Sequence, residues 1–242
     1  MNSTGRTPIT TADQPRGMGI EEMSLEPGIL IMYGPIAGLA QPSPFFAEAN
    51  AVLGAAPKRK AEFFAGRNLA RLALERMHAP VVALARKEDR SPEWPRDIVG
   101  SIAHNEDKVA VAVARESACA GLGIDLEKRG RVDGDLQSII GAPGDDSRLD
   151  PTALFVAKEA VFKAVNPTWK EFVDFSEVSI VSSDLRRGFS ARPKRGLLSH
   201  AAIRAGRGTF LEIGDLILAC FWVVPPSDIV AGDTKKEAVP WP

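Results

Sequence analysis

Two acidic residues interrupt an apolar segment, GIDLE, at positions 123 to 127. The apolar spacing predicts a short strand, in which residues i and i+2 point to the same face. Asp125 and Glu127 would then lie about 6.6 Å apart along the backbone, on one face. Carboxylate oxygens placed in this way favour Mg²⁺ or Mn²⁺. The alternative is a pair of acids on a solvated edge strand that form ion pairs with Lys128 and Arg129.

A third carboxylate lies further along the chain, in LFVAKEAVFKAVNP at positions 154 to 167. The apolar residues of this stretch recur at helical spacing, which predicts a helix that stops at Asn166-Pro167. Glu159 and Lys163 are separated by four residues and would share one face of the helix. With Lys158, they form a group that could meet phosphate and metal together. The alternative is an ordinary Glu-Lys pair on a solvated helix.

Taken together, the GIDLE segment and the F-x-x-KEA-x-x-K pattern resemble the 4'-phosphopantetheinyl transferases of the surfactin- and enterobactin-synthetase-activating type. Members of this family move phosphopantetheine from coenzyme A to a serine of a carrier protein. Three further segments follow the order of the family's motifs: KRKAEFFAGRNLAR at 58 to 71, RSPEWP at 90 to 95 and GSIAHN at 100 to 105. The resemblance covers residues 50 to 182. The chain departs from the family pattern at Ala103, where the family commonly has Ser or Thr just before the histidine.

The resemblance implies a role for each residue of the site. Asp125, Glu127 and Glu159 would hold Mg²⁺, or Mn²⁺, against the pyrophosphate of the co-substrate coenzyme A. Glu159 would also accept the serine proton, and Lys163 would stabilise the departing phosphate. The residues implied to bind coenzyme A are Arg59, Arg67, Arg86, Arg90, His104, Asp125 and Lys158. Whether Arg86 or Arg90 contacts the 3'-phosphate stays open.

Without the resemblance, the same residues fit other interpretations. The arginines at 58 to 71 could be a solubilising helix face, and a lone histidine is more often structural than catalytic. A catalytically degenerate module that binds coenzyme A or a carrier protein is one alternative function. A Mg²⁺-dependent phosphoesterase built on the same carboxylates is another, although it leaves the arginine helix and the GSIAH corner without a role.

Composition narrows the partners and the cellular location that we expect. The formal net charge of −1 disfavours a nucleic-acid binder that works through bulk charge. Cys119 and Cys220 lack the spacing of a zinc site or a disulfide framework. The chain has neither a leader-like start nor the ~20 consecutive apolar residues of a membrane span. We therefore expect a cytoplasmic monomer, free of membranes, whose partner is an apo carrier protein.

The expected fold is α+β, with two similar lobes. By family resemblance, each lobe is a small, mainly antiparallel sheet packed on a long helix, and a pseudo-twofold axis relates the two. The predicted divisions are a disordered arm, a coenzyme A-binding lobe, a lobe with the metal and catalytic motifs, and a disordered tail, at residues 1–26, 27–117, 118–224 and 225–242.

Local patterns predict several elements within these lobes. The first strand is expected at 28 to 33 and a single long helix at 45 to 78. Residues 128 to 150 are rich in Gly, Asp and Arg and predict a mobile segment with one short helical turn. Strands at 208 to 213 and 216 to 224 would form a hairpin around Gly214-Asp215.

Overall fold

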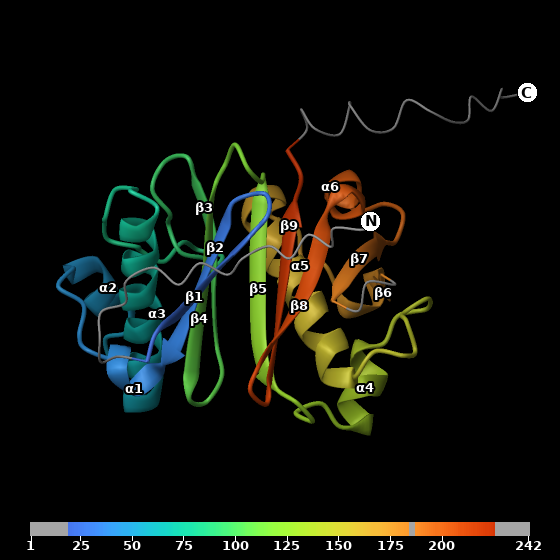
Figure 1. Ribbon diagram of the computed structural model, residues 1–242, viewed down its shortest axis with the longest axis horizontal. Coiled ribbons are helices and arrows are strands. Elements are labelled where there is room, and N and C mark those ends of the chain that lie inside the picture. The colour runs from blue at the N-terminus through green and yellow to red at the C-terminus, as the bar shows by residue number, and fades with distance from the viewer. Residues whose placement is uncertain (1–18, 184–186, 226–242) are drawn as a thin grey trace, which may run out of the picture.

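The computed structural model describes residues 19–183 and 187–225 of the chain (Figure 1). The elements, in chain order, are β1 (Glu21–Leu25), β2 (Ile29–Pro35), α1 (Ile36–Leu39), α2 (Phe46–Ala51), α3 (Pro57–Arg76), β3 (Ile98–His104), β4 (Lys108–Arg115), β5 (Gly121–Lys128), α4 (Gly134–Ile140), α5 (Pro151–Trp169), the 3₁₀ turn η1 (Phe175–Glu177), β6 (Val178–Ser182), β7 (Gly188–Pro193), α6 (His200–Ala205), β8 (Arg207–Ile213) and β9 (Leu216–Val223).

The strands of the described residues form two antiparallel sheets. The first has the order β1-β2-β4-β3, and the second has the order β5-β9-β8-β7-β6. Strands β3 and β5 are the neighbouring edges of the two sheets and lie side by side (Figure 1). An α+β fold with antiparallel sheets is thus confirmed. The predicted hairpin is also present, because β8 and β9 pair around Gly214, whose φ of 62° suits glycine.

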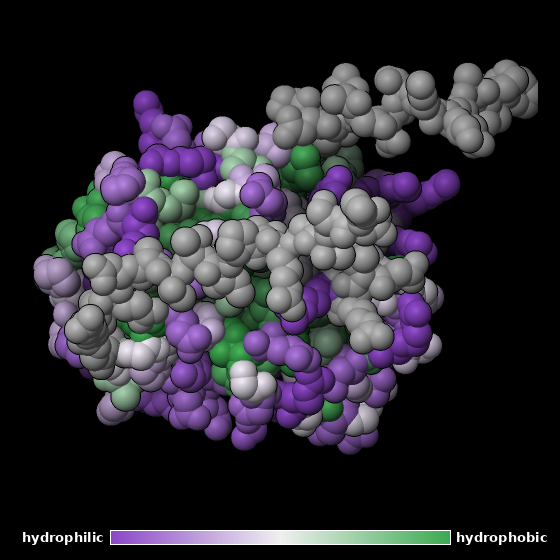
Figure 2. Space-filling view, viewed as in Figure 1, coloured by the Kyte–Doolittle hydropathy of each residue, from purple (hydrophilic) through white to green (hydrophobic). Residues whose placement is uncertain are grey.

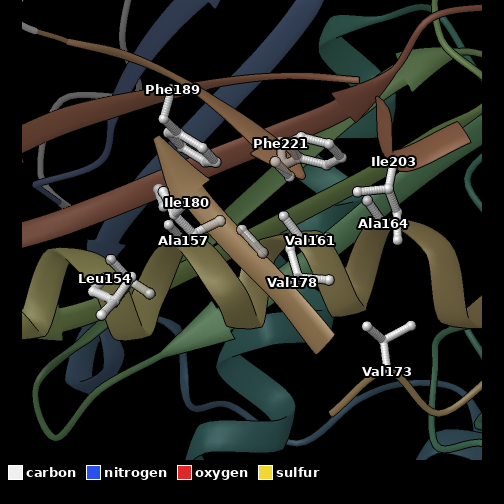
Figure 3. Packing of buried hydrophobic residues seen from close by; sticks show 14 of the residues in the cluster. Leu154, Ala157, Val161, Ala164, Val173, Val178, Ile180, Phe189, Ile203 and Phe221 are labelled. Carbon is white, nitrogen blue, oxygen red and sulfur yellow. The ribbon is translucent and has the colours of Figure 1, made fainter. Parts of the chain in front are cut away.

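Alternating side chains of the strands give the described residues three large hydrophobic cores, beside a small cluster of Val52, Phe63 and Phe64. On β4, Val111 faces α3, whereas Ala112 faces the second sheet. On β9, Phe221 faces α5, whereas Leu218 faces the first sheet. The two helices therefore cover the outer faces of the sheets, and the inner faces pack on each other. In Figure 3 the side chains of α5 lie against those of β6, β7 and β9, among them Leu154, Ala157, Val161, Ile180, Phe189 and Phe221.

The visible surface is largely polar. In Figure 2, hydrophilic side chains cover most of the periphery outside the grey segments, and hydrophobic ones show in patches in the middle and at the upper left. None of the helices in the described ranges combines the length and the apolar character that crossing a bilayer requires.

Strand β1 corrects the predicted arm. Residues 21–25 pair with β2, and Tyr33 donates a hydrogen bond of 2.6 Å from its hydroxyl to Glu21. The expectation of disorder up to residue 26 is therefore wrong for this strand, whose acidic residues hid its alternation. The rest of the predicted arm up to residue 18, and the predicted tail from residue 226, lie outside the described residues.

The predicted helix over 45 to 78 is two helices. Helix α2 ends at Ala51 and α3 begins at Pro57, with Gly54 between them at a φ of 83°. Glycine adopts this left-handed conformation without a steric penalty, and proline is well suited to a first helical turn. The sequence pattern missed the break because apolar residues continue through it.

The structure also corrects the end of α5 and the segment before it. The helix continues through Pro167 to Trp169, because the amide of Lys170 still bonds to the carbonyl of Asn166 at 2.8 Å. Pro167 has no amide hydrogen, so the helix passes through it with one backbone hydrogen bond missing. The segment at 128 to 150 contains the two-turn helix α4, whose first turn is capped by Asp133. Strand β7 and helix α6 were not predicted.

Candidate active site

Two glycines bring the acidic strand β5 against helix α5. Gly121 and Gly123 occupy the face of β5 that contacts α5, and a Cβ atom on Gly123 would lie 2.0 Å from the carbonyl oxygen of Ala160. Only glycine permits this close approach of backbone to backbone. Asp125 and Glu127 continue the same face of β5 by strand alternation. The acids of the strand therefore point toward the helix that carries Glu159 and Lys163.

Three carboxylates surround one ammonium group at this contact. Lys163 donates a hydrogen bond of 2.6 Å from Nζ to Oδ1 of Asp125, which is buried. Burial lowers the pKa of Lys163, but the charges of Asp125, Glu159 and Glu127 outweigh it and raise the pKa overall. Burial raises the pKa of Glu159, with Asp125 adding to the effect and Lys163 opposing it. Burial and then Asp125 raise the pKa of Glu127. The cluster thus has an excess of negative charge.

The donor set has the chemistry of a divalent-cation site. In residues 19–183 and 187–225, no group of three or more His, Cys, Asp or Glu side chains is drawn together as a ready metal cage. The nearby acids nevertheless offer oxygen ligands only, which suits Mg²⁺ or Mn²⁺. Burial and the nearby Asp125 raise the pKa values of Glu127 and Glu159, so the charged form of both carboxylates is disfavoured in the metal-free protein. A divalent cation would favour the charged form, so the residues fit the predicted metal.

A basic pocket lies on the first lobe. It has a volume of about 130 Å³, and its lining includes five of the six basic residues predicted to bind coenzyme A: Arg59, Arg67, Arg86, Arg90 and His104. They come from α3, from the loop at 85–93 and from the end of β3. The fold therefore gathers residues that lie up to 45 positions apart in sequence. Their shared location supports anion binding.

His104 is neutral in this pocket. Arg59 donates a hydrogen bond of 3.0 Å from Nη1 to Nε2 of His104, which requires that ring nitrogen to be an acceptor. Glu62 lies 3.3 Å from the same Arg59 nitrogen. Burial lowers the pKa of His104, Glu62 opposes the effect, and Arg59 and Lys163 add to it.

Arg67 is the most deeply buried basic residue of the pocket. Its side chain is buried, its guanidinium lies 4.5 Å from the ring centre of Phe63, and its Nε donates to the carbonyl of Leu84 at 2.8 Å. Burial lowers the pKa of Arg67 to about 10, with Arg71, Arg59 and Arg86 adding to the effect against Glu48. The Nε of Arg67 therefore holds the backbone of Leu84, while the side chain still lines the pocket.

The basic pocket adjoins a cavity that reaches Glu159. This second cavity has a volume of about 450 Å³, is lined by Glu159 and Lys163, and shares Arg90, Pro92 and Ile102 with the first. We call the two adjoining cavities the groove, which extends from the basic residues of the first lobe to Glu159 and Lys163 of the second.

Comparisons with known proteins agree with this geometry. Residues 47–114 match the family model described as the 4'-phosphopantetheinyl transferase N-terminal domain. The chain is 30% identical over 159 residues to the 4'-phosphopantetheinyl transferase PptT of Mycobacterium tuberculosis. The matched region covers 62% of this chain and 70% of that protein. The chain belongs to the 4'-phosphopantetheinyl transferase family. The predicted family is thus confirmed.

Two other relatives share the family name. Similarity to the 4'-phosphopantetheinyl transferase Npt of Nocardia iowensis is 32% identity over 142 residues, or 55% of this chain and 64% of the relative. The chain is also 35% identical over 156 residues to the 4'-phosphopantetheinyl transferase Svp of Streptomyces mobaraensis, a match that covers 60% of this chain and 63% of that relative. The chain thus spans slightly less than two thirds of the length of these two relatives.

Lys158 departs from the arrangement predicted for a phosphopantetheinyl transferase. Its side chain is buried, and Nζ donates to Asp145 at 2.7 Å and to the carbonyls of Ile140 and Phe175 at 2.7 and 2.8 Å. These three acceptors use all the protons of the ammonium group. The structure therefore does not bring Lys158 to the groove, and Lys158 instead links α4 and η1 to α5.

The sequence interpretation missed Ser101 as part of the groove. The amide of Ile124 on β5 donates to Oγ of Ser101 on β3 at 3.1 Å, which links the edges of the two sheets next to Asp125. Ser101 also lines the cavity that reaches Glu159. The GSIAHN motif contains Ser101, but the resemblance assigned a role only to His104 of this motif.

Proposed function

We propose that this chain transfers the 4'-phosphopantetheine arm of coenzyme A to a serine of an apo carrier protein. The serine Oγ forms a bond to the β-phosphorus of the pyrophosphate, and the bond from that phosphorus to the bridging oxygen breaks. The leaving group is 3',5'-ADP, and the serine proton goes to a base of the protein. Family membership supports this reaction class.

The observation that carries the proposal is the groove itself. Its basic end suits the phosphates of a nucleotide, and its other end offers the carboxylate of Glu159 and the ammonium of Lys163, which bonds to Asp125. A transferase of this type needs both ends at once, because the phosphate that is attacked belongs to the molecule that must be held. The degenerate binding module and the phosphoesterase each leave one end without a role.

The side chains at the acidic end have distinct tasks in this mechanism. Glu159 accepts the proton from the serine Oγ, and its raised pKa makes it a better base than an exposed glutamate. Lys163 remains charged and stabilises the negative charge that develops on the departing 3',5'-ADP. Asp125, Glu127 and Glu159 would hold Mg²⁺, or Mn²⁺. When bound, that cation would polarise the phosphoryl oxygens.

The basic end binds and orients coenzyme A. Arg59 and Arg67 present guanidinium groups that suit phosphate oxygens, and Arg86 or Arg90 would reach the 3'-phosphate from the loop. His104 would contact a phosphate through a ring nitrogen. Arg90 also lines the acidic cavity, which favours Arg86 for the end of the nucleotide that lies further from the reaction.

Finer features of the proposal follow from the family. We expect a pseudo-twofold relation between lobes 27–117 and 118–224, a monomer, and a cytoplasmic location without nucleic-acid or membrane partners. The division between lobes is supported by the boundary between the two sheets, since β4 ends at Arg115 and β5 begins at Gly121.

One experiment separates the proposal from its alternatives. The protein is incubated with fluorescent coenzyme A, Mg²⁺ and an apo carrier protein, and label on the carrier serine is measured. Labelling that is lost with a chelator and restored by Mg²⁺ supports the transferase. Coenzyme A binding without labelling would instead indicate the degenerate module, and coenzyme A breakdown without a carrier would indicate the phosphoesterase.

The rate of transfer should fall as the pH falls, because Glu159 becomes protonated. Only the deprotonated form of Glu159 accepts the serine proton. Burial raises its pKa in the metal-free protein and a bound Mg²⁺ would lower it, so a lower Mg²⁺ concentration should move the loss of activity to higher pH. The measurement is kcat at saturating substrates from pH 4.5 to 8, at high and low Mg²⁺ concentration. A Glu159→Gln variant should lose this acidic limb with most of its activity. Wild-type kcat that stays level down to pH 4.5 at both Mg²⁺ concentrations would contradict the role of Glu159.

Coenzyme A should bind more tightly as the pH falls from 8 to 6. His104 has a lowered pKa in the free protein, and a nearby phosphate would favour its charged form and raise that pKa. Binding then takes up a proton, so it weakens as the pH rises. Calorimetric titration in buffers of different ionisation enthalpy measures this uptake. A His104→Gln variant should lose it, and equal uptake in both proteins would contradict the contact.

A further inference from the structure

The loop that carries Arg86 and Arg90 begins at a residue whose backbone is held on both sides. The amide of Leu84 donates to Oε1 of Glu48 at 2.7 Å, and its carbonyl accepts from Nε of Arg67 at 2.8 Å. Leu84 is completely buried and lies outside any helix or strand. Its backbone hydrogen bonds therefore come from charged side chains instead of a sheet or helix.

Glu48 is the centre of this arrangement. It is fully buried, and Arg71 donates to both of its carboxylate oxygens at 2.8 and 2.7 Å. The hydroxyl of Ser43 donates to Oε2 at 2.5 Å. Together with the Leu84 amide, these donors satisfy the carboxylate. A buried charge that is fully paired holds its neighbours in one geometry, whereas removal of one partner leaves an uncompensated group.

The segment that follows Leu84 is a short hairpin, residues 85–93. The amide of Glu93 donates to the carbonyl of Ala85 at 2.9 Å, and the amide of Lys87 donates to Ser91 at 2.9 Å. Arg86 and Arg90 lie on this hairpin and line the basic pocket. Residues at its tip also line the cavity of Glu159 and Lys163. The hairpin thus borders both ends of the groove, and its base is Leu84.

We propose that Glu48, paired with Arg71, is a positioning residue for coenzyme A: it fixes the base of the 85–93 hairpin and so holds Arg86 and Arg90 at the nucleotide. This role rests on the proposed function. Glu48 touches no substrate and acts only through Leu84. Its loss should therefore weaken coenzyme A binding and leave the transfer step little changed at saturating coenzyme A.

The test compares Glu48→Gln with the wild-type protein. The amide keeps the size of the side chain but presents an NH₂ donor to a site that is filled with donors. We expect the Kd for 3',5'-ADP and the KM for coenzyme A to rise about tenfold, since a charge-assisted hydrogen bond is lost. We expect kcat to change less than about threefold, and hydrogen exchange to increase in peptides that cover 85–93.

Asp145→Asn is the matched control. Asp145 also accepts from a buried cation, Lys158, and from the backbone amides of Ala142 and Ile180, but it lies in the second lobe. The same carboxylate-to-amide change there should lower the melting temperature without altering 3',5'-ADP binding or exchange in the hairpin. Equal effects of both variants on binding would show general loosening and overturn the positioning role.

The remaining outcomes separate this role from the proposed function. Wild-type protein that does not bind 3',5'-ADP would count against the proposed function itself. Wild-type binding that Glu48→Gln leaves unchanged would overturn the positioning role alone. If Glu48→Gln does not fold, Ser43→Ala removes a single donor from Glu48. A small rise in Kd with faster hairpin exchange would then support the role, and unchanged values of both would refute it.

Discussion

Replacing Asp125 by asparagine should reduce the rate of transfer by a factor on the order of 10²–10³, as expected when a charge-stabilising group is removed from a reaction centre. The fold should persist, because asparagine has the same shape and can still accept the hydrogen bond from Lys163. The lost negative charge weakens the proposed metal site and leaves Lys163 without its nearest counter-ion. The measurements are kcat/KM at several Mg²⁺ concentrations and the melting temperature.

Asp215→Asn is the control for this prediction. Asp215 also forms an ion pair with a lysine, Lys128, at 3.2 Å, but both side chains are exposed at the far end of β5 and the start of β9. Its replacement should leave both activity and stability nearly unchanged, since exposed pairs contribute little. An Asp125→Asn variant with wild-type activity in the presence of a chelator would eliminate Asp125 as a metal ligand.

Replacing Gly123 by alanine should cost about 3 kcal/mol of stability, because the new methyl group cannot be accommodated without moving the main chain. Its Cβ would lie 2.0 Å from the carbonyl oxygen of Ala160 and 2.5 Å from the amide nitrogen of Ala164. For a chain of this size, the melting temperature should fall by roughly 6–12 °C. Helix α5 must move away from β5, so transfer should fall even where the protein remains folded.

Gly134→Ala is the matched control for the glycine. A Cβ atom at Gly134 would have no neighbouring heavy atom within 4 Å, and Gly134 is the first residue of helix α4. The same added methyl group should therefore leave activity unchanged and stability equal or slightly higher, since alanine favours helix. Melting curves and transfer rates of both variants test the idea. If the two variants behaved alike, the close approach of α5 to β5 would not be what assembles the site.

Short-range patterns in the sequence predicted the acidic end of the site. Asp125 and Glu127 share a strand face because strands alternate, and Glu159 and Lys163 share a helix face because helices repeat every 3.6 residues. The family motifs then linked these two elements, and the comparisons confirmed the family. The roles of these residues stay predictions.

Local patterns failed where elements end or where strands are polar. Strand β1 contains two glutamates, so its sequence lacks the apolar alternation that predicts a strand. It forms because it pairs with β2. The break between α2 and α3 depends on the conformation of a single glycine, Gly54. These features are settled by contacts with other segments, which a window of sequence does not contain.

Only the tertiary structure separated the two lysines of the KEA-x-x-K segment. Lys158 and Lys163 are both cations on one helix, and the family resemblance assigned both to the site. The glycines of β5 set the face of α5 that approaches the strand, which places Lys163 at Asp125 and turns Lys158 into contact with Asp145. Periodicity fixes which residues share a face, but packing against a particular partner determines what that face meets.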